Sequence, residues 1–186
     1  MRPVRRDEIV DYQTYEEERE AFRARVLEQK RARRVHLGEF LTFLFENHDT
    51  IRYQIQEMIR AERIVKEADI RHEIDTYNQL LGGEGELGCT LLIEIPDPER
   101  RPELLARWRA LPERVYLRLA DGRRVSALYD PAQVGEERLS SVQYLKFNVG
   151  AGEPVAVGVE GLPDLDGEAE FDEATRVALR QDLGLG

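Results

Sequence analysis

The stretch from Leu37 to Val65 carries the most regular hydrophobic pattern in the chain. Its members follow one another at alternating steps of four and three residues, which places them on one stripe of an α-helix, or of two helices in register. We expect a break near Asn47, because Asn47 and Asp49 are both capping residues and Asp49 is suited to begin a second helix. The stripe consists of Leu37, Leu41, Leu44, His48, Ile51, Ile55, Met58, Glu62 and Val65.

Further helical patterns lie on both sides of this stretch. Residues 12–34 predict a first helix, and the segment that ends at Gly82-Gly83 predicts a last one in the N-terminal half. If residues 66–68 form a tight turn, residues 50–65 and 69–81 become an antiparallel pair of helices. Without that turn they form a single rod.

The second half of the chain changes to the alternation of β-strands. Asp121-Gly122 predicts a hairpin turn, because glycine supplies the positive φ that a tight turn requires. Helical patterns near 98–111 and 172–183 interrupt and close this half. The expected strands are residues 89–95, 115–119, 125–129, 142–149 and 155–159.

These patterns predict a single α+β domain over residues 1–186. We expect an N-terminal helical hairpin bundle of about three to four helices in residues 1–83. It should pack on an antiparallel β-meander of about five strands in residues 84–186, with a short C-terminal helix.

Composition narrows the class of protein. The chain has 186 residues, 41% of them hydrophobic, and a net charge of −10. Its single cysteine, Cys89, rules out a disulfide framework within the chain and agrees with a cytoplasmic location. No apolar run is long enough for a membrane span, and the N-terminus lacks the apolar core of a signal peptide, so we expect no membrane association.

Basic residues are concentrated in one segment. Residues 19–34 hold seven lysines and arginines against two glutamates. Such a patch could bind phosphate groups, but no aromatic residues are interleaved with it in the manner used to stack bases. We therefore interpret it as a solvated helix face and expect no nucleic-acid partner.

Two interpretations remain open for the polar residues of the helical half. Carboxylates and imidazoles on facing helices can hold iron or manganese, and Asp69-x-x-His72 is the nearest match to the Glu-x-x-His pattern of such sites. The competing interpretation is a surface of ion pairs such as Glu57–Arg60 and Glu62–Lys66. The metal alternative uses Glu62, Asp69, His72 and Glu73.

Glu62 occupies the hydrophobic stripe, so we expect it to be buried. A buried carboxylate must be paired, hydrogen-bonded or neutral. We predict that an arginine from another element, or His72 across the hairpin, holds it. No serine lies in a nucleophile elbow, and we predict that Cys89 is an inert core residue. The sequence therefore assigns no catalytic residues and does not say whether the protein is an enzyme.

Several segments resemble the bacterial domain-of-unknown-function 3501 family, and the likeness covers essentially the whole chain. The segments are residues 44–50, 54–64, 77–78, 93–96 and 142–147. Genes of that family often lie beside those of rubrerythrin-like proteins and iron–sulfur oxidoreductases, so the resemblance implies a part in peroxide or redox defence. The family pattern carries a basic residue at position 48 that need not be histidine, which argues against a metal-ligand role for His48.

The resemblance also points to a recognition surface or a buried ion-pair network. Its residues would be Glu46, Asn47, Asp49, Gln54, Gln56, Glu57, Arg60, Glu62 and Arg63. We therefore expect a cytoplasmic accessory or binding protein that has no cofactor and acts with a rubrerythrin-like or iron–sulfur partner in oxidative-stress defence. The alternative is an iron- or manganese-binding protein with redox or peroxide chemistry.

Overall fold

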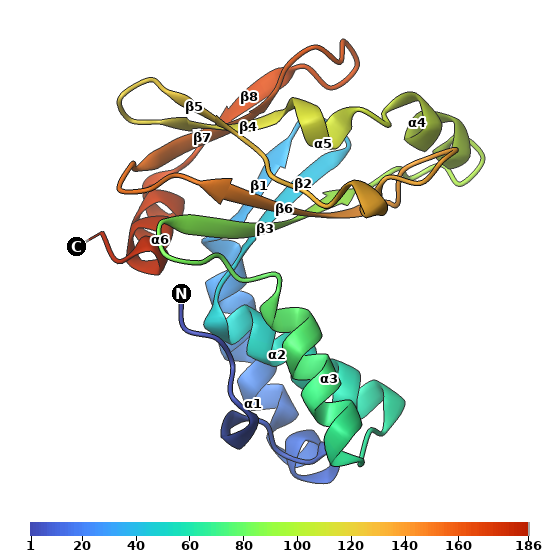
Figure 1. Cartoon of the computed structure of the whole chain (residues 1–186), viewed down its shortest axis with the longest axis vertical. Coiled ribbons are helices and arrows are strands. Elements are labelled where there is room, and N and C mark those ends of the chain that lie inside the picture. Colours follow the sequence, from blue (N-terminus) through green and yellow to red (C-terminus); the bar gives the residue numbers. More distant parts are fainter. Residues whose placement is uncertain (186) are drawn as a thin grey trace.

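Two four-stranded antiparallel sheets form the upper part of the computed structural model, which describes residues 1–185 (Figure 1). The first sheet has the strand order β1-β2-β3-β6 and the second the order β5-β4-β7-β8. The strands of the first sheet are β1 (Arg34–Leu37), β2 (Leu41–Glu46), β3 (Glu86–Ile93) and β6 (Val142–Asn148). Those of the second are β4 (Val115–Leu119), β5 (Arg124–Ser126), β7 (Pro154–Val159) and β8 (Gly167–Glu170).

Side chains from both sheets meet in one hydrophobic cluster. Phe43, Leu91 and Phe147 from the first sheet and Leu117 and Val157 from the second are all fully buried in it. Burial of apolar surface between two twisted sheets is the main stabilising term of a β-sandwich. The space between the two sheets therefore holds the larger of the two hydrophobic cores of the protein.

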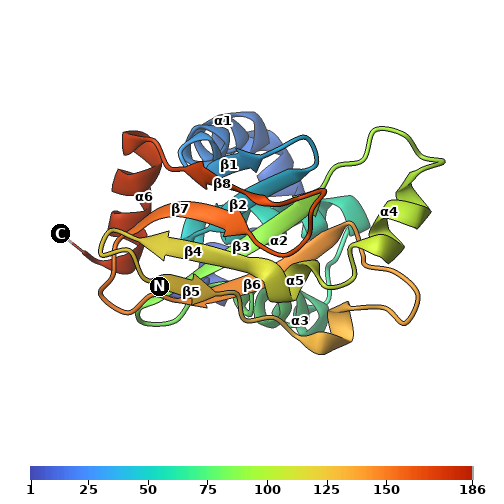
Figure 2. The same cartoon turned by 90° about the horizontal axis from the view of Figure 1, so that it is seen from above.

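The helices α1 (Tyr12–Arg31), α2 (His48–Glu62) and α3 (Glu67–Asn78) form a second body below the sheets (Figure 1). They have a core of their own, to which the N-terminal segment adds Val4 and Ile9. Seen from above, α4 (Arg101–Arg107) and α6 (Glu173–Leu183) lie at opposite ends of the sandwich (Figure 2). The remaining elements are α5 (Leu111–Arg114) and the 3-10 turns Arg6–Glu8 and Pro131–Gln133.

The expected α+β class is confirmed, but the Leu37–Val65 stripe is helical only in its second half. Leu37 ends β1, residues 38–40 form a turn, and residues 41–46 are β2. Every residue of β2 is buried, so the strand has no alternation of polar and apolar positions, and its pattern cannot be told from that of a buried helix. The expected helical half, 1–83, thus supplies two strands to the first sheet.

An element boundary does lie at Asn47, but it separates strand β2 from helix α2 and not two helices, and the capping residue differs. Asn47 itself is the N-cap of α2, and its side chain accepts a hydrogen bond of 2.9 Å from the Thr50 N–H. Asp49 lies inside the first turn instead of beginning the helix. An asparagine side chain at this position satisfies an otherwise unpaired backbone donor.

For the remaining elements, the type predicted from the sequence is closer to the structure than the predicted arrangement. The hairpin at Asp121-Gly122 joins β4 to β5, and Gly122 has a φ of +85°. The helix expected over 98–111 is replaced by two short ones, and β8 was not expected. The single meander is instead two sheets, because β1 and β2 come from the first half of the chain and extend the β3–β6 pair through β3.

The prediction of a buried Glu62 is wrong. Ile51, Ile55 and Ile59 form the buried stripe of α2, whereas Glu62 is exposed and makes no ion pair within residues 1–185. The helix ends at Glu62, and Arg63 turns the chain with a positive φ of 51°. Val65 is therefore off the helix, with 71% of its surface exposed.

Candidate functional site

Most polar side chains of residues 46–57 are turned inward, where they join α2 to neighbouring elements. Glu46 is buried and accepts hydrogen bonds from Thr50 at 2.5 Å and from Thr90 at 2.7 Å. Asp49 accepts a bond of 2.8 Å from the Gln29 amide of α1, and Asn47 donates to the same amide at 3.3 Å. These contacts hold α2 against β3 and α1.

Gln56 fixes the N-terminal segment in the same way. Its buried amide accepts from the Val10 N–H at 2.8 Å and donates to the Val10 carbonyl at 3.2 Å. Asn78 of α3 makes an equivalent pair of bonds with the backbone of Val4, at 2.8 and 2.9 Å. The first ten residues are thus held by two side-chain amides that replace a neighbouring strand.

Glu57 is the centre of an ion-pair network between α1 and α2. It accepts from the Tyr15 hydroxyl at 2.8 Å and from the Arg19 guanidinium at 2.8 and 2.9 Å. Burial acts to raise the pKa of Glu57, but the hydrogen bonds from Arg19 and Tyr15 outweigh it and the pKa is lowered. The ion pair expected between Glu57 and Arg60 is present at 3.5 Å.

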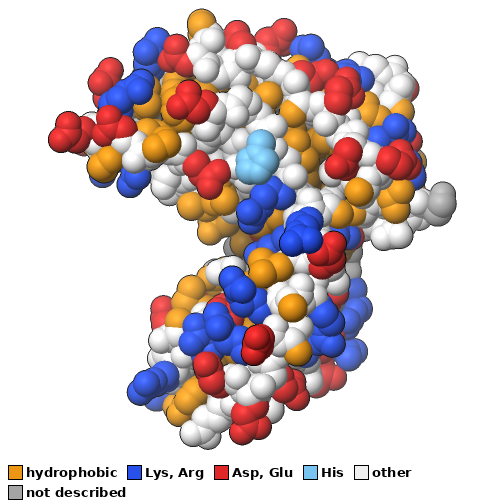
Figure 3. Space-filling model, turned by 180° about the vertical axis from the view of Figure 1, so that it is seen from behind, with side chains coloured by type: hydrophobic (Ala, Val, Ile, Leu, Met, Phe, Trp, Pro, Cys, Tyr) orange, Lys and Arg blue, Asp and Glu red, His pale blue; other side chains and the backbone are white. Residues whose placement is uncertain are grey.

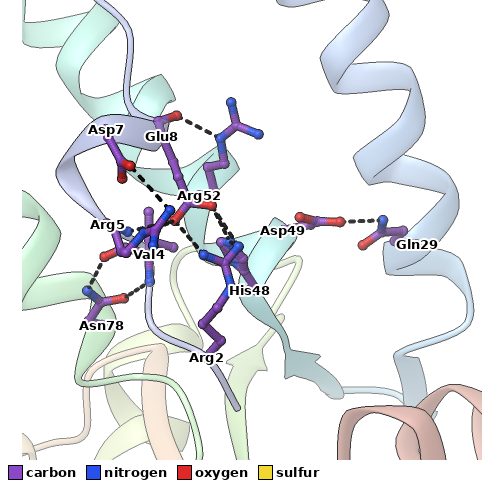
Figure 4. A network of polar contacts seen from close by, with 10 residues as sticks. All are labelled: Arg2, Val4, Arg5, Asp7, Glu8, Gln29, His48, Asp49, Arg52 and Asn78. Atoms are coloured by element: carbon purple, nitrogen blue, oxygen red, sulfur yellow. Dashed lines mark hydrogen bonds and ion pairs between the residues drawn. The ribbon is translucent and has the colours of Figure 1, made fainter.

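His48 lies in a separate polar network at the start of α2 (Figure 4). Its Nε2 is 2.8 Å from the Arg2 guanidinium and 3.1 Å from the Glu8 carboxylate. Its Nδ1 is buried and has no hydrogen-bond partner within residues 1–185. Burial, and next the charge of Arg2, lower the pKa of His48, so the ring is neutral near pH 7.

The binding residues suggested by the resemblance therefore do not share one surface. Gln54 faces Tyr77 of α3, and Arg60 pairs with Glu16 of α1 at 3.5 Å. Glu62 and Arg63 are exposed at the turn after α2. The others form the internal contacts described above, which position the helices.

The residues of the metal alternative come together at the same turn. Glu62, Asp69, His72 and Glu73 line an open hollow of about 440 Å³. Within residues 1–185, however, no three His, Cys, Asp or Glu side chains are grouped closely enough to hold a metal ion. The hollow brings the four residues to one place without forming a finished coordination site.

A larger candidate site lies between the end of α3 and the outer face of β6. We call it the α3–β6 hollow; its volume is about 510 Å³, within the usual range for ligand pockets. Two large hydrophobic side chains at its wall are exposed, Leu128 at 54% and Tyr144 at 40%. Its lining comprises Thr76, Gln79, Leu80, Cys89, Leu128, Tyr129, Asp130, Gln133, Tyr144, Leu145 and Lys146.

Lys146 gives the α3–β6 hollow a cationic group. Within residues 1–185 its ammonium forms no ion pair, whereas the carboxylate of Asp130 accepts a hydrogen bond of 2.9 Å from the Ala132 N–H. The thiol of Cys89, which is fully buried, has its pKa raised well above the ordinary value by burial. The hollow can therefore bind an apolar group that carries a nearby negative charge.

Sequence reasoning missed this hollow. Tyr144 and Lys146 alternate with Leu145 and Phe147, so the pattern of β6 places both on the face opposite the sandwich core. A tyrosine at an exposed strand position was the available signal. The approach of α3 to that face is a tertiary contact that no local pattern contains.

The basic segment of α1 lies close to aromatic side chains. Lys and Arg side chains gather at the waist where α1 runs into β1 (Figure 3). Two aromatic rings do lie among these cations. Arg25 and Arg52 lie over the Phe22 ring, and Lys30 over the Tyr53 ring, at 5.1 to 5.7 Å. The rings are covered by the chain's own cations, and the absence of a nucleic-acid partner stays a prediction.

Comparison with known proteins gives a family and a structural relative. The model of the family described as Protein of unknown function (DUF3501) matches residues 3–183. A crystal structure of a novel protein of unknown function from Burkholderia pseudomallei K96243 is 31% identical to the chain, with a TM-score of 0.89. The match covers 98% of this chain and 100% of the other. No curated protein matches the sequence.

No helix within residues 1–185 combines the length and the apolar character needed to cross a membrane.

Proposed function

Since the chain belongs to the DUF3501 family of proteins of unknown function, we propose a function from its own surface: a binding protein that docks a partner at the α3–β6 hollow. The observation that carries this proposal is the exposure of Leu128 and Tyr144 beside a hollow of about 510 Å³. Large exposed hydrophobic side chains that border a concave surface are typical of interaction sites. The protein then acts through binding, without chemistry of its own.

The class of partner comes from the resemblance to the family. Neighbouring genes suggest a rubrerythrin-like protein or an iron–sulfur oxidoreductase, and hence an accessory role in cytoplasmic defence against peroxide. The polar residues of the family motif support an accessory role, because they are used to hold α1, α2 and the N-terminal segment together.

Binding of purified partners tests the proposal. A rubrerythrin-like protein and an iron–sulfur oxidoreductase encoded beside the gene should bind the full chain in calorimetry. Leu128→Asp or Tyr144→Asp should weaken binding by about tenfold or more, because each places a charge in an apolar contact. Val65→Asp is the control, since Val65 is equally apolar and 71% exposed but lies at the far turn. Equal binding by all variants would exclude the hollow.

The metal alternative is the second candidate, and it is favoured by the hollow that gathers Glu62, Asp69, His72 and Glu73. Oxygen and imidazole ligands suit iron and manganese. Elemental analysis of protein purified without a metal-affinity tag should find stoichiometric iron or manganese if this candidate is right, and His72→Ala should lower the metal content. A metal content well below one per chain would count against it.

A further inference from the structure

The outer edge of β6 is closed mostly by side chains. The Tyr144 N–H donates to Gln133 Oε1 at 2.8 Å, and Gln133 Nε2 donates to the Tyr144 carbonyl at 3.2 Å. The Val142 N–H donates to the Ser140 hydroxyl at 3.2 Å. At these two positions the outer edge of β6 has no neighbouring strand within residues 1–185, although its backbone could pair with one.

Main-chain pairing closes this edge at the next residue whose backbone points outward, Lys146. Leu128 and Lys146 exchange two backbone hydrogen bonds, of 2.7 and 2.8 Å. Gln133 gives Tyr144 one donor and one acceptor, which is the same pair that a strand residue would supply. The amide of Gln133 therefore occupies the place of the next residue in an added strand.

The bonds of Gln133 can be exchanged without leaving a group unpaired. Both are exposed to solvent, so the freed amide would be hydrated, while a backbone would take over the Tyr144 N–H and carbonyl. Unprotected edge strands invite pairing with other chains, and native proteins limit it by blocking or covering the edge. A removable cap beside a ligand-sized hollow suggests regulated access.

We propose that the edge of β6 accepts an extended segment of the partner protein, which displaces Gln133 and pairs with Tyr144. This inference rests on the proposed function and adds the mode of binding. An apolar side chain of the segment enters the α3–β6 hollow beside Leu128, and an acidic side chain pairs with Lys146. Addition of a strand to a free edge draws affinity from the backbone and specificity from such pockets.

The occupant is assigned by charge. Lys146 is one of the β6 residues whose backbone faces the free edge. Its side chain lines the hollow and forms no ion pair within residues 1–185. Asp130 lies in the same lining but caps the turn at Ala132. An extended segment that alternates apolar and acidic residues complements this edge, whereas a basic one meets an uncompensated cation.

A hexapeptide library tests the proposal on the full chain. In half of the peptides apolar residues alternate with acidic residues. In the other half of the library they alternate with basic residues. The full chain should select the acidic peptides, and Lys146→Glu should weaken their binding by about tenfold or more. Gln133→Ala should strengthen binding several-fold, because the cap no longer competes. Gln181→Ala is the control, since Gln181 is an exposed glutamine of α6 that lies outside the lining of the hollow and the edge of β6.

Hydrogen exchange separates strand addition from simple docking. In the complex with the selected peptide, the Tyr144 amide should stay protected in Gln133→Ala, and it should exchange fast in the free variant. If Gln133→Ala leaves the affinity for the peptide unchanged and the Tyr144 amide unprotected, strand addition is excluded. The proposed function still stands in that case if Leu128→Asp weakens partner binding. Self-association of Gln133→Ala in place of peptide binding would also overturn the proposal.

Discussion

His48 shows how the surroundings of a single side chain set the response of the protein to acid. Burial and the neighbouring Arg2 and Arg52 lower its pKa, and they outweigh Glu8 and Asp49, which act in the opposite direction. In the unfolded chain the pKa returns to about 6.5. Below that value the unfolded state binds the proton more readily than the folded state, so this contribution to stability is present above about pH 6.5 and is lost as the pH falls.

We therefore predict that His48→Gln reduces the loss of stability between pH 7.5 and pH 5.5. Urea unfolding of the wild type and the variant at both values measures the effect. The wild type and the variant differ only at position 48, so the comparison isolates the contribution of this ring. An unchanged pH dependence would show that the ring does not titrate differently in the folded protein.

Glu57 and Glu62 lie on the same helix but differ in their surroundings. Glu57→Ala removes the acceptor of Tyr15 and Arg19, and we expect it to lower the free energy of unfolding by about 1–3 kcal/mol. Glu62→Ala, on exposed surface, should change it by less than about 0.5 kcal/mol. Denaturant unfolding checks both values. Similar losses for the two variants would mean that the Glu57 network contributes no stability.

At the scale of elements, a buried ion pair joins the end of α1 to α6. The Arg33 guanidinium donates to Asp182 at 2.7 and 2.9 Å, and the side chains are only 8% and 9% exposed. Arg33→Met should cost about 3–5 kcal/mol of unfolding free energy, because it leaves the Asp182 carboxylate buried without its cation. The thermal midpoint and urea unfolding report this loss.

Two comparisons isolate the effect of the uncompensated charge. Arg33→Met combined with Asp182→Leu should recover most of the stability, since neither charge then remains buried. Arg31→Met removes an arginine from an exposed pair with Glu28, whose side chains are 79% and 72% accessible, and should change little. If the double variant is no more stable than Arg33→Met, the loss comes from packing.

At the scale of the whole molecule, Gly88 sets how closely the helical body approaches the first sheet. A Cβ at this position would lie 1.9 Å from the backbone carbonyl oxygen of Leu80. Gly88→Ala must therefore push the chain after α3 away from β3, and we expect a loss of about 2–4 kcal/mol in unfolding free energy. Faster hydrogen exchange in α3 should accompany it.

Gly167→Ala provides the control for this substitution. Its added Cβ would meet a Leu37 methyl group at 3.4 Å, which is an ordinary contact. The variant should stay within about 1 kcal/mol of the wild type. If Gly88→Ala lowers the free energy of unfolding as little as Gly167→Ala, α3 can shift at no cost. The α3–β6 hollow would then not be held at a fixed width.

The candidate sites differ in how far local sequence could reveal them. The residues of the turn-side hollow, Glu62, Asp69, His72 and Glu73, could be named from sequence as the metal alternative, because a short connection brings two helices back on each other. The α3–β6 hollow needs residues that are more than 60 positions apart, from Thr76 to Tyr144, and no pattern of period two or 3.6 relates them.

The sequence alone determined the local elements with strong periodic or turn signals. Asn47 ends one element and caps the next, Asp121-Gly122 closes a hairpin, and residues 142–149 alternate as a strand. These features depend on neighbours within one turn or one pleat, so the physics that creates them is contained in a few adjacent residues.

Tertiary structure alone decided which apolar runs are strands and which polar residues are buried. Residues 41–46 become a strand because β1 and β3 hydrogen-bond to both sides of them, which a stripe of apolar residues does not indicate. Glu46 is buried beside Thr90 of β3, whereas Glu62, on the predicted stripe, is left in solvent. Burial depends on what another part of the chain places opposite a residue, and that partner is distant in sequence.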